Sequence, residues 1–232
     1  MKKQGIILKT ISYKENSKIV YFFTEEGKVS AIARGAKKIK SPLRIETSNL
    51  SLVSFELSNN SFPTLVDISV DDSFKNIQGN YRKNFYANYI ADYIYHNQDL
   101  KDKKLFDFFV KTLKKMNEGM DEEELTLIFE IKYLYFLGSA PNLKSCFYCG
   151  TNEKISGFSI KEGSVVCKNH LEKADVSFDI TLILLKMYYT SLDDYLPFLT
   201  KDEKLELREV INRYYDYHVG YCPKLRNLIN KI

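Results

Sequence analysis

Three of the four cysteines and one of the three histidines fall within 25 residues of one another. Cys146 and Cys149 form a C-x₂-C pair, and after seventeen intervening residues Cys167 and His170 form a C-x₂-H pair. Each short turn can bring two side chains onto one ion, and two such turns complete a tetrahedron. Zn²⁺ accepts three thiolates and one imidazole in closed structural sites, which keep no open position for a reacting water. The spacing therefore predicts one structural zinc ion per chain, with a short hairpin at 155–166 between the two turns.

The remaining cysteine and histidines leave other readings open. Cys222 could replace His170 as the fourth ligand, although it lies far along the chain and has no partner at short spacing. Without a metal, the cluster would be thiols beside an incidental histidine. His96 and His218 lie near the ends of predicted helices, and we expect them to pack or to face solvent. Neither has the second histidine four residues away that a helical zinc enzyme would show.

The N-terminus shows no secretory leader, so the cysteines are expected to be thiols or metal ligands rather than disulfides. Lys9 interrupts the apolar run 5–8, and no signal-peptide core follows the basic start. The longest uncharged apolar runs fall far short of the roughly 18 residues that a membrane span needs. We therefore expect a cytoplasmic protein without membrane contact.

Positive charge is concentrated at the start of the chain. Residues 1–44 carry eleven Lys and Arg against three Glu, a net charge of +8, whereas the remainder carries 23 basic and 27 acidic residues. Five cations fall in eleven residues, with Gly35 and Pro42 breaking regular structure among them: Arg34, Lys37, Lys38, Lys40 and Arg44. Such a loop suits binding along a phosphate backbone, and the alternative is an ordinary solvated face. The aromatics of 13–23 could stack on bases, but strand alternation places at least one face of 21–23 in the core.

The first 70 residues predict five short strands, because they are rich in β-branched and aromatic residues and broken by turn-prone stretches. The strands are expected at 4–12, 18–24, 28–36, 48–58 and 63–70. A slip in the alternation between Leu52 and Phe55 predicts a bulge or a coil of the strand. Five short strands suit a small β-barrel, and the OB-fold is the leading candidate.

From about residue 80 the apolar residues recur at three and four, the spacing of helices. Residues 86–94 carry such a stripe, and 179–192 predicts a helix buried through Leu182, Leu185 and Tyr189. Asp121 with Glu124 resembles a capping box that opens a helix, and Gly138 would end it. Thr200 with Glu203 resembles a second capping box, and the helix behind it carries an apolar side at 207–214.

These elements predict an α+β protein: an OB-fold barrel at 1–79, a linker at 71–80, and an all-helical domain at 80–232 with a zinc module inserted at about 143–172. The sequence carries none of the G-x-x-x-x-G-K-[ST], H-E-x-x-H and G-x-S-x-G motifs. We therefore expect no enzymatic activity.

A series of short motifs follows in order along the chain. The N-terminal motifs lie at Gly5–Lys9, Glu15–Val20, Phe23–Lys28, Arg34–Lys38 and Ser41. The later motifs lie at Leu137–Gly150, Tyr217–Gly220 and, with a looser match, Lys224–Arg226. Together they resemble the RecO family of bacterial DNA repair and recombination mediators. Many members have a fourth cysteine where this chain has His170, and the family binds zinc where the cysteines are kept.

The resemblance implies a nucleoid-associated protein that binds single- and double-stranded DNA and anneals complementary strands. It implies partnership with RecR, contact with the acidic C-terminal tail of single-strand-binding protein, and, indirectly, loading of RecA onto coated strands. A cation beside an apolar pocket would suit that tail. We expect this tail contact near Lys111, Lys114 and Lys115, in a stretch that also carries Phe108, Phe109 and Leu113. The competing prediction is an RNA- or ribosome-binding OB-fold protein with structural zinc.

Overall fold

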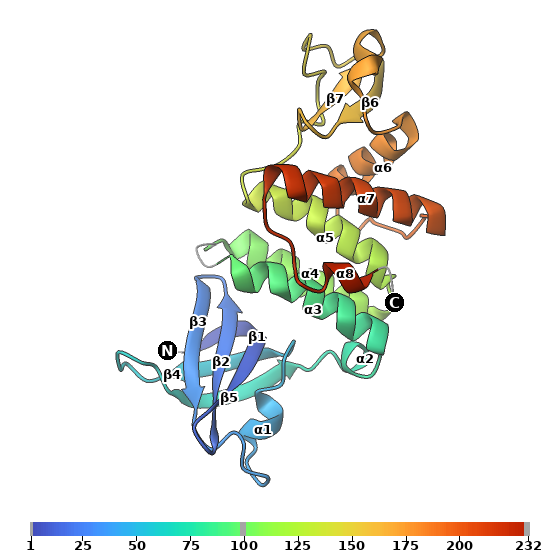
Figure 1. Cartoon of the computed structure of the whole chain (residues 1–232). Coiled ribbons are helices and arrows are strands. Elements are labelled where there is room, and N and C mark those ends of the chain that lie inside the picture. The colour runs from blue at the N-terminus through green and yellow to red at the C-terminus, as the bar shows by residue number, and fades with distance from the viewer. Residues whose placement is uncertain (1, 98–100, 230–232) are drawn as a thin grey trace. The chain divides into compact units, whose positions relative to one another are not determined.

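The structure is a computed structural model that describes residues 2–97 and 101–229 (Figure 1). Residues up to Glu122, with those from Asn227 onward, form one compact unit, and Glu123–Arg226 form a second. Among the described residues, the first unit holds the sheet, four helices that follow its third and fifth strands, and most of a short helix near the C-terminus, and the second holds further helices and a two-stranded hairpin. In the described ranges, no helix has the length and apolar character needed to cross a membrane.

The sheet of the first unit has five strands, as predicted. They are β1 (Lys3–Tyr13), β2 (Ser17–Thr24), β3 (Gly27–Ala33), β4 (Leu52–Leu57) and β5 (Leu65–Asp72). Their spatial order is β3-β2-β1-β4-β5, and all neighbours are antiparallel. The outer strands also meet, because Ile32 forms a parallel bridge with Thr64 and its N–H donates to the Pro63 carbonyl at 2.9 Å. The sheet therefore curls until its two edges touch.

Two strand predictions were too long. β3 ends at Ala33 rather than 36, because Arg34 begins a series of tight turns. β4 starts at Leu52 rather than 48, since Leu50 takes a left-handed φ of 62°, which extended chain does not allow. The pairing of β4 with β5 shifts register between Leu52 and Val53, but the extra residue is Asp71 of β5, so the irregularity lies in the partner strand rather than in β4.

The sheet encloses an apolar core, and its outer face is partly covered by helices. The rings of Phe22 and Phe55 stack inside, with centroids 4.1 Å apart. On the opposite face of β2, Phe23 packs against Phe106 and Phe109 at 6.0 and 6.3 Å. Both faces of the strand are therefore buried at this level. The enclosed core consists mainly of Ile7, Val20, Phe22, Ala31, Ala33, Ala36, Val53, Phe55, Leu65 and Ile68.

The helices of this unit are α1 (Leu43–Glu46), α2 (Lys75–Gln78), α3 (Tyr81–His96) and α4 (Lys103–Glu118). The apolar stripe predicted at 86–94 lies on α3 and is confirmed, because its members are all buried: Tyr86, Tyr89, Ile90, Tyr93 and Ile94. Asn80 caps the helix by accepting a bond from the Lys83 N–H. The expected linker at 71–80 contains α2, and Phe74 ahead of it is fully buried.

The second unit contains α5 (from Glu122 to Phe136), β6 (Ile155–Ser159), β7 (Ser164–Cys167), the 3₁₀ helix η1 (Lys168–Lys173), α6 (Phe178–Tyr189) and α7 (Lys201–His218). α8 (Arg226–Ile229) is the last described element, and all of it except Arg226 belongs to the first unit. The capping box of Thr200 and Glu203 is confirmed at the start of α7. Gly138, with φ of 69°, follows the end of α5 as predicted. Inside the unit, Glu130 of α5 pairs with Arg208 of α7, and both side chains are buried.

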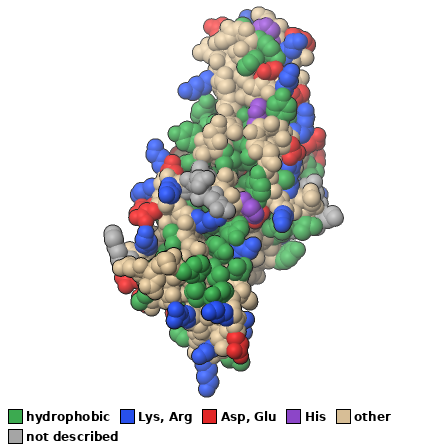
Figure 2. Space-filling model, turned by 60° about the vertical axis from the view of Figure 1, so that its left-hand side comes forward, with side chains coloured by type: hydrophobic (Ala, Val, Ile, Leu, Met, Phe, Trp, Pro, Cys, Tyr) green, Lys and Arg blue, Asp and Glu red, His purple; other side chains and the backbone are tan. Residues whose placement is uncertain are grey.

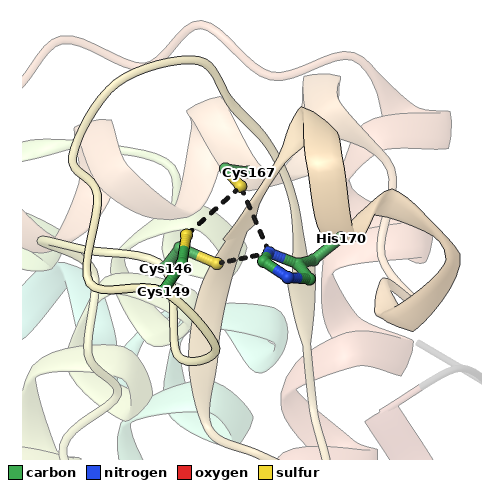
Figure 3. Close-up of side chains that lie close together, drawn as sticks. All are labelled: Cys146, Cys149, Cys167 and His170. Atoms are coloured by element: carbon green, nitrogen blue, oxygen red, sulfur yellow. Dashed lines mark hydrogen bonds between the residues drawn. The ribbon is translucent and has the colours of Figure 1, made fainter.

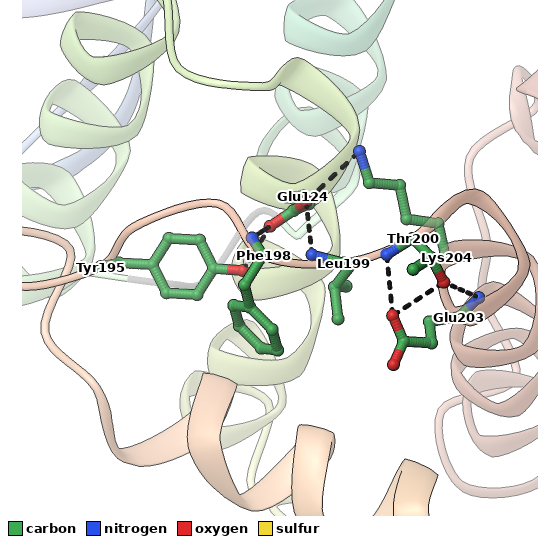
Figure 4. A network of polar contacts seen from close by, with 7 residues as sticks. All are labelled: Glu124, Tyr195, Phe198, Leu199, Thr200, Glu203 and Lys204. Carbon is green, nitrogen blue, oxygen red and sulfur yellow. Dashed lines mark hydrogen bonds and ion pairs between the residues drawn. The ribbon is translucent and has the colours of Figure 1, made fainter.

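Glu124 has partners that its local spacing does not reveal (Figure 4). Its buried carboxylate accepts bonds from the Tyr195 hydroxyl at 2.6 Å and from the N–H groups of Phe198 and Leu199, both at 3.1 Å. Lys204 lies 3.3 Å from the same carboxylate. Glu124 therefore fixes the segment between α6 and α7 onto α5, and the capping box expected for it with Asp121 stays a prediction.

The buried side of α6 is not the predicted one. Its core-facing residues are Ile180, Thr181, Ile183, Leu184 and Met187. Leu182 and Tyr189, expected in the core, are 46% and 54% exposed. The helix is apolar on both sides, so periodicity alone could not decide which side the neighbouring elements cover.

Candidate metal centre and nucleic-acid interface

The four predicted metal ligands come together at the hairpin of the second unit (Figure 3). Cys146 and Cys149 lie in the loop after α5, Cys167 ends β7, and His170 lies in η1. Their ligand atoms all lie within 4.8 Å of one another. The predicted hairpin is confirmed as β6 and β7, which pair antiparallel and carry the second ligand turn at their end. Cys222 is not among the grouped side chains, so the described geometry favours His170 as the fourth member.

The distances within the cluster suit a tetrahedral ion. With Zn–S bonds of about 2.3 Å and Zn–N bonds of about 2.0 Å, adjacent sulfurs lie about 3.8 Å apart and sulfur and nitrogen about 3.5 Å. The Cys149 and Cys167 sulfurs are 3.7 Å apart. His170 Nδ1 lies 3.4 Å from the Cys167 sulfur and 3.6 Å from the Cys146 sulfur. One ring nitrogen cannot donate a single proton well to two sulfurs, whereas a shared cation satisfies all of them.

Backbone N–H groups around the turn of Cys146 and Cys149 favour ionisation of the Cys146 thiol. Burial of the Cys146 thiol opposes its ionisation, but backbone N–H groups of Cys167, Tyr148 and Cys149 outweigh it and lower its pKa to about 6. The pKa of Cys149 is raised: the Thr151 N–H favours its thiolate, but lost hydration and the neighbouring sulfurs oppose it. Crowded thiols that disfavour a second negative charge are a donor set that a cation would stabilise.

Two glycines are needed to build this module. Gly150, directly after Cys149, takes a φ of 72°, and its N–H donates to the Cys146 carbonyl at 2.8 Å, which closes the turn. Gly157 in β6 packs so closely that an added Cβ would lie 2.8 Å from the Ala174 Cβ. The chain can therefore wrap closely around the cysteine cluster.

The other two histidines pack as expected. His96 ends α3 and lies 3.2 Å from the Asp92 carboxylate. His218 ends α7, and its Nε2 lies 2.6 Å from the Ile160 carbonyl oxygen.

All five predicted DNA-contacting cations are exposed on the segment between β3 and the end of α1: Arg34, Lys37, Lys38, Lys40 and Arg44. We call residues 34–46 the basic segment. No acidic side chain in the described ranges forms an ion pair with any of the five. Figure 2 shows Lys and Arg side chains gathered at the lower tip of the molecule, where Figure 1 places α1. The positive charge is therefore available to an outside partner.

The turn between β1 and β2 adds charge beside the basic segment. The Lys37 N–H donates to the Asn16 carbonyl at 3.1 Å, and its Nζ to the Lys14 carbonyl at 3.4 Å. Burial, and then the charge of Arg44, lower the pKa of Lys18. Lys14 and Lys18 therefore belong to the same basic surface. Both lysines lie outside the charged run at 34–44, but the turn-prone residues at 14–17 could have placed them at this end of the sheet.

Most of the nearby aromatic residues are unavailable for stacking on bases. Phe22 and Phe23 are buried, and the Tyr21 ring packs edge-on against Tyr95 at 5.3 Å. Tyr13 is half-buried, and Lys14 Nζ lies 5.4 Å from its ring centre. The expectation that one face of 21–23 is core is confirmed, and in fact both phenylalanines are enclosed.

Comparisons with known proteins decide the family. Residues 1–74 match the family described as Recombination protein O N terminal, and residues 78–227 match Recombination protein O C terminal. A DNA repair protein RecO of Halalkalibacterium halodurans is 33% identical over the whole of this chain and 94% of its own length. Relatives with the same name from Bacillus cereus (strain AH187) and Bacillus anthracis are also 33% identical, covering all of this chain and 97% of theirs. The chain belongs to the RecO family.

Membership in the RecO family supports a role in DNA repair and confirms the resemblance seen in the sequence. The two family matches meet between residues 74 and 78, within the predicted linker. The compact units divide elsewhere, because α2, α3 and α4 group with the sheet. The division at 79–80 therefore stays a prediction.

Proposed function

We propose that this RecO-family chain is a non-enzymatic recombination mediator that binds single- and double-stranded DNA through the basic segment. The observation that carries the proposal is the set of five exposed cations, none held by an acidic side chain of the described residues, on a protein whose relatives are DNA repair proteins. Unpaired cations on a sheet end can neutralise phosphates without reading bases, which suits a mediator that acts on any sequence.

We infer that the sheet is an OB-fold. Support comes from the strand order β3-β2-β1-β4-β5 and from the parallel contact between β3 and β5 that joins its edges. A small five-stranded barrel of this kind is a common support for nucleic-acid binding. The basic segment connects the third and fourth strands.

We infer that the cluster of Cys146, Cys149, Cys167 and His170 binds one structural Zn²⁺. Its donor set and distances support this ion, and four protein ligands leave no position for an activated water. Bound zinc would tie the loop after α5 to β7 and η1, so it would supply stability to the module rather than chemistry.

The partners proposed from the family are RecR, the acidic tail of single-strand-binding protein and, indirectly, RecA, with annealing of complementary strands as the shared activity. A cytoplasmic, nucleoid-associated location follows from these partners. The expected tail contact needs adjustment, because Phe109 and Leu113 are completely buried. Phe108 and the neighbouring lysines of α4 are the members of that group still within reach of a partner.

The competing proposal, an RNA- or ribosome-binding protein, is not favoured by relatives that are named for DNA repair. Competition between single-stranded DNA and RNA of equal length separates the two. RNA that displaces DNA at equal or lower concentration would reverse the preference.

The experiment for the DNA site is a salt titration of binding to a single-stranded oligonucleotide. Four or five phosphate contacts give a slope of log affinity against log salt of about −3, at roughly −0.7 per phosphate. Replacing Lys37, Lys38 and Lys40 together by Ala should flatten the slope by about two units and weaken binding at low salt. The fold should survive, since the three side chains are exposed.

A matched control removes the same charge elsewhere in the same unit. Lys75, Lys104 and Lys114 are exposed on α2 and α4, outside the basic segment. Their triple replacement by Ala should leave the slope near the parent value. If the two triple variants lose equal affinity and slope, non-specific attraction explains the binding and the basic segment is not the site.

A further inference from the structure

Two large aliphatic side chains project from the basic segment. Ile39 is 86% exposed and Ile45 is 76% exposed. Ile39 is the most exposed of the large hydrophobic residues in the described part of the chain. It lies between Lys38 and Lys40, so a strand held by these cations would bring its bases within reach of an uncovered aliphatic group.

The backbone that carries Ile39 is braced rather than extended into solvent. Successive turns link Gly35 to Lys38, Lys38 to Ser41 and Ser41 to Arg44, each by a carbonyl that accepts the N–H three residues later at 3.0–3.1 Å. Ala36 at the start of the series is fully buried in the barrel core. The side chain is therefore presented on a fixed support, as a contact residue needs to be.

We propose that Ile39 is an apolar wedge that enters between adjacent bases of the bound strand and unstacks them; this rests on the proposed function. Proteins that hold the backbone with cations commonly insert an aliphatic or aromatic side chain between base steps. The flanking lysines would hold the phosphates on both sides of the separated step. The enclosed phenylalanines of β2 cannot supply such a contact, and of the two exposed isoleucines Ile39 is the one with a lysine on each side.

An anionic lipid surface is the alternative ligand for a protein segment that combines exposed cations with aliphatic side chains. An interfacial membrane contact needs a helix with a broad apolar face. The basic segment has one helix, α1, of four residues. Ile45 on this helix and Ile39 on the turns before it form too small an apolar surface for that mode, whereas one aliphatic side chain between two lysines suits a gap between two bases.

The test uses the full chain and oligonucleotides that carry one 2-aminopurine between adenines, whose fluorescence is quenched by stacking and rises when it unstacks. Parent protein at saturation should raise the fluorescence at least twofold. Ile39→Ser should lose most of this rise and weaken binding by about tenfold, because burial of the aliphatic group is lost. Ile39→Leu, which keeps an aliphatic side chain, should retain the rise.

Two controls separate the wedge from the phosphate site. Val66→Ser removes an aliphatic side chain, 66% exposed on β5, and should behave as the parent. The salt slope of Ile39→Ser should stay at the parent value, since no cation is removed.

A full fluorescence rise with Ile39→Ser at saturation overturns the wedge while leaving the DNA site intact. Absence of DNA binding by the parent overturns the proposed function itself and is seen in the affinity, before any fluorescence variant is compared. Cosedimentation with phosphatidylglycerol vesicles that depends on Ile39, with no rise of 2-aminopurine fluorescence when the protein binds DNA, would assign the side chain to lipid and overturn the wedge.

Discussion

Replacing Glu124 by Ala is expected to lower the free energy of unfolding by about 4 kcal/mol. The change removes the acceptor of three donors at once: the Tyr195 hydroxyl and the N–H groups of Phe198 and Leu199. Each buried donor left without an acceptor costs about 1–3 kcal/mol, and the bonds to Tyr195 and Leu199 are buried. Phe198 is exposed enough to regain a water, so its N–H adds less.

The measurement is urea unfolding followed by far-ultraviolet circular dichroism, with the free energy taken by linear extrapolation. Glu206→Ala provides the control, because Glu206 is an exposed carboxylate on α7 and should change stability by less than about 0.5 kcal/mol. Limited proteolysis should also cut first between 190 and 200 in the Glu124 variant, since that segment loses its attachment to α5. A loss below about 1 kcal/mol, with unchanged cleavage, would refute the reasoning.

Two further predictions concern the metal and pH. Purified protein should carry about one zinc per chain. Cys146→Ser should lower both the zinc content and the free energy of unfolding, since structural zinc sites contribute on the order of 10 kcal/mol to folding. If protein made under reducing, metal-replete conditions contains no zinc, the assignment is wrong. Burial, and then the nearby Tyr188, raise the pKa of Tyr214 to about 12 from an ordinary value of 10.0. The folded state therefore holds this proton more tightly, so the stability it supplies is complete below about pH 10 and is lost as pH rises toward 12. Tyr214→Phe should show a flatter decline in urea midpoint over that window, and parallel declines would count against this cause.

The elements with local signals could be predicted from the sequence. The capping box at Thr200 and Glu203, the stop at Gly138 and the buried stripe of α3 all depend on residues within a few positions of each other. The C-x₂-C and C-x₂-H spacing likewise brought together the side chains that the structure groups.

The remaining features depend on distant partners. The donors that Tyr195, Phe198 and Leu199 offer to Glu124 lie more than seventy residues later in the chain, where no local pattern could indicate them. The side of α6 that is buried was predicted wrongly, because apolar residues lie on both sides and only the packing of β6 and α7 decides between them. The exposure of Ile39 could not be predicted either, since a single isoleucine among lysines can lie in the core or on the surface.

The contact between β3 and β5 determines where the five-stranded sheet should open most easily. Every other pair of neighbouring strands shares a ladder of hydrogen bonds, whereas these two meet through the isolated bridge of Ile32 and Thr64. Opening at this contact breaks the fewest hydrogen bonds, so the amide hydrogen of Ile32 should exchange through local opening. The amide hydrogen of Val20, on a strand paired on both sides, should exchange only when a larger part of the sheet unfolds. The basic segment begins at Arg34, two residues after Ile32 of this bridge. A nucleic acid that clamps the segment would therefore slow the opening, and hydrogen exchange at Ile32 would report occupancy of a surface it does not touch.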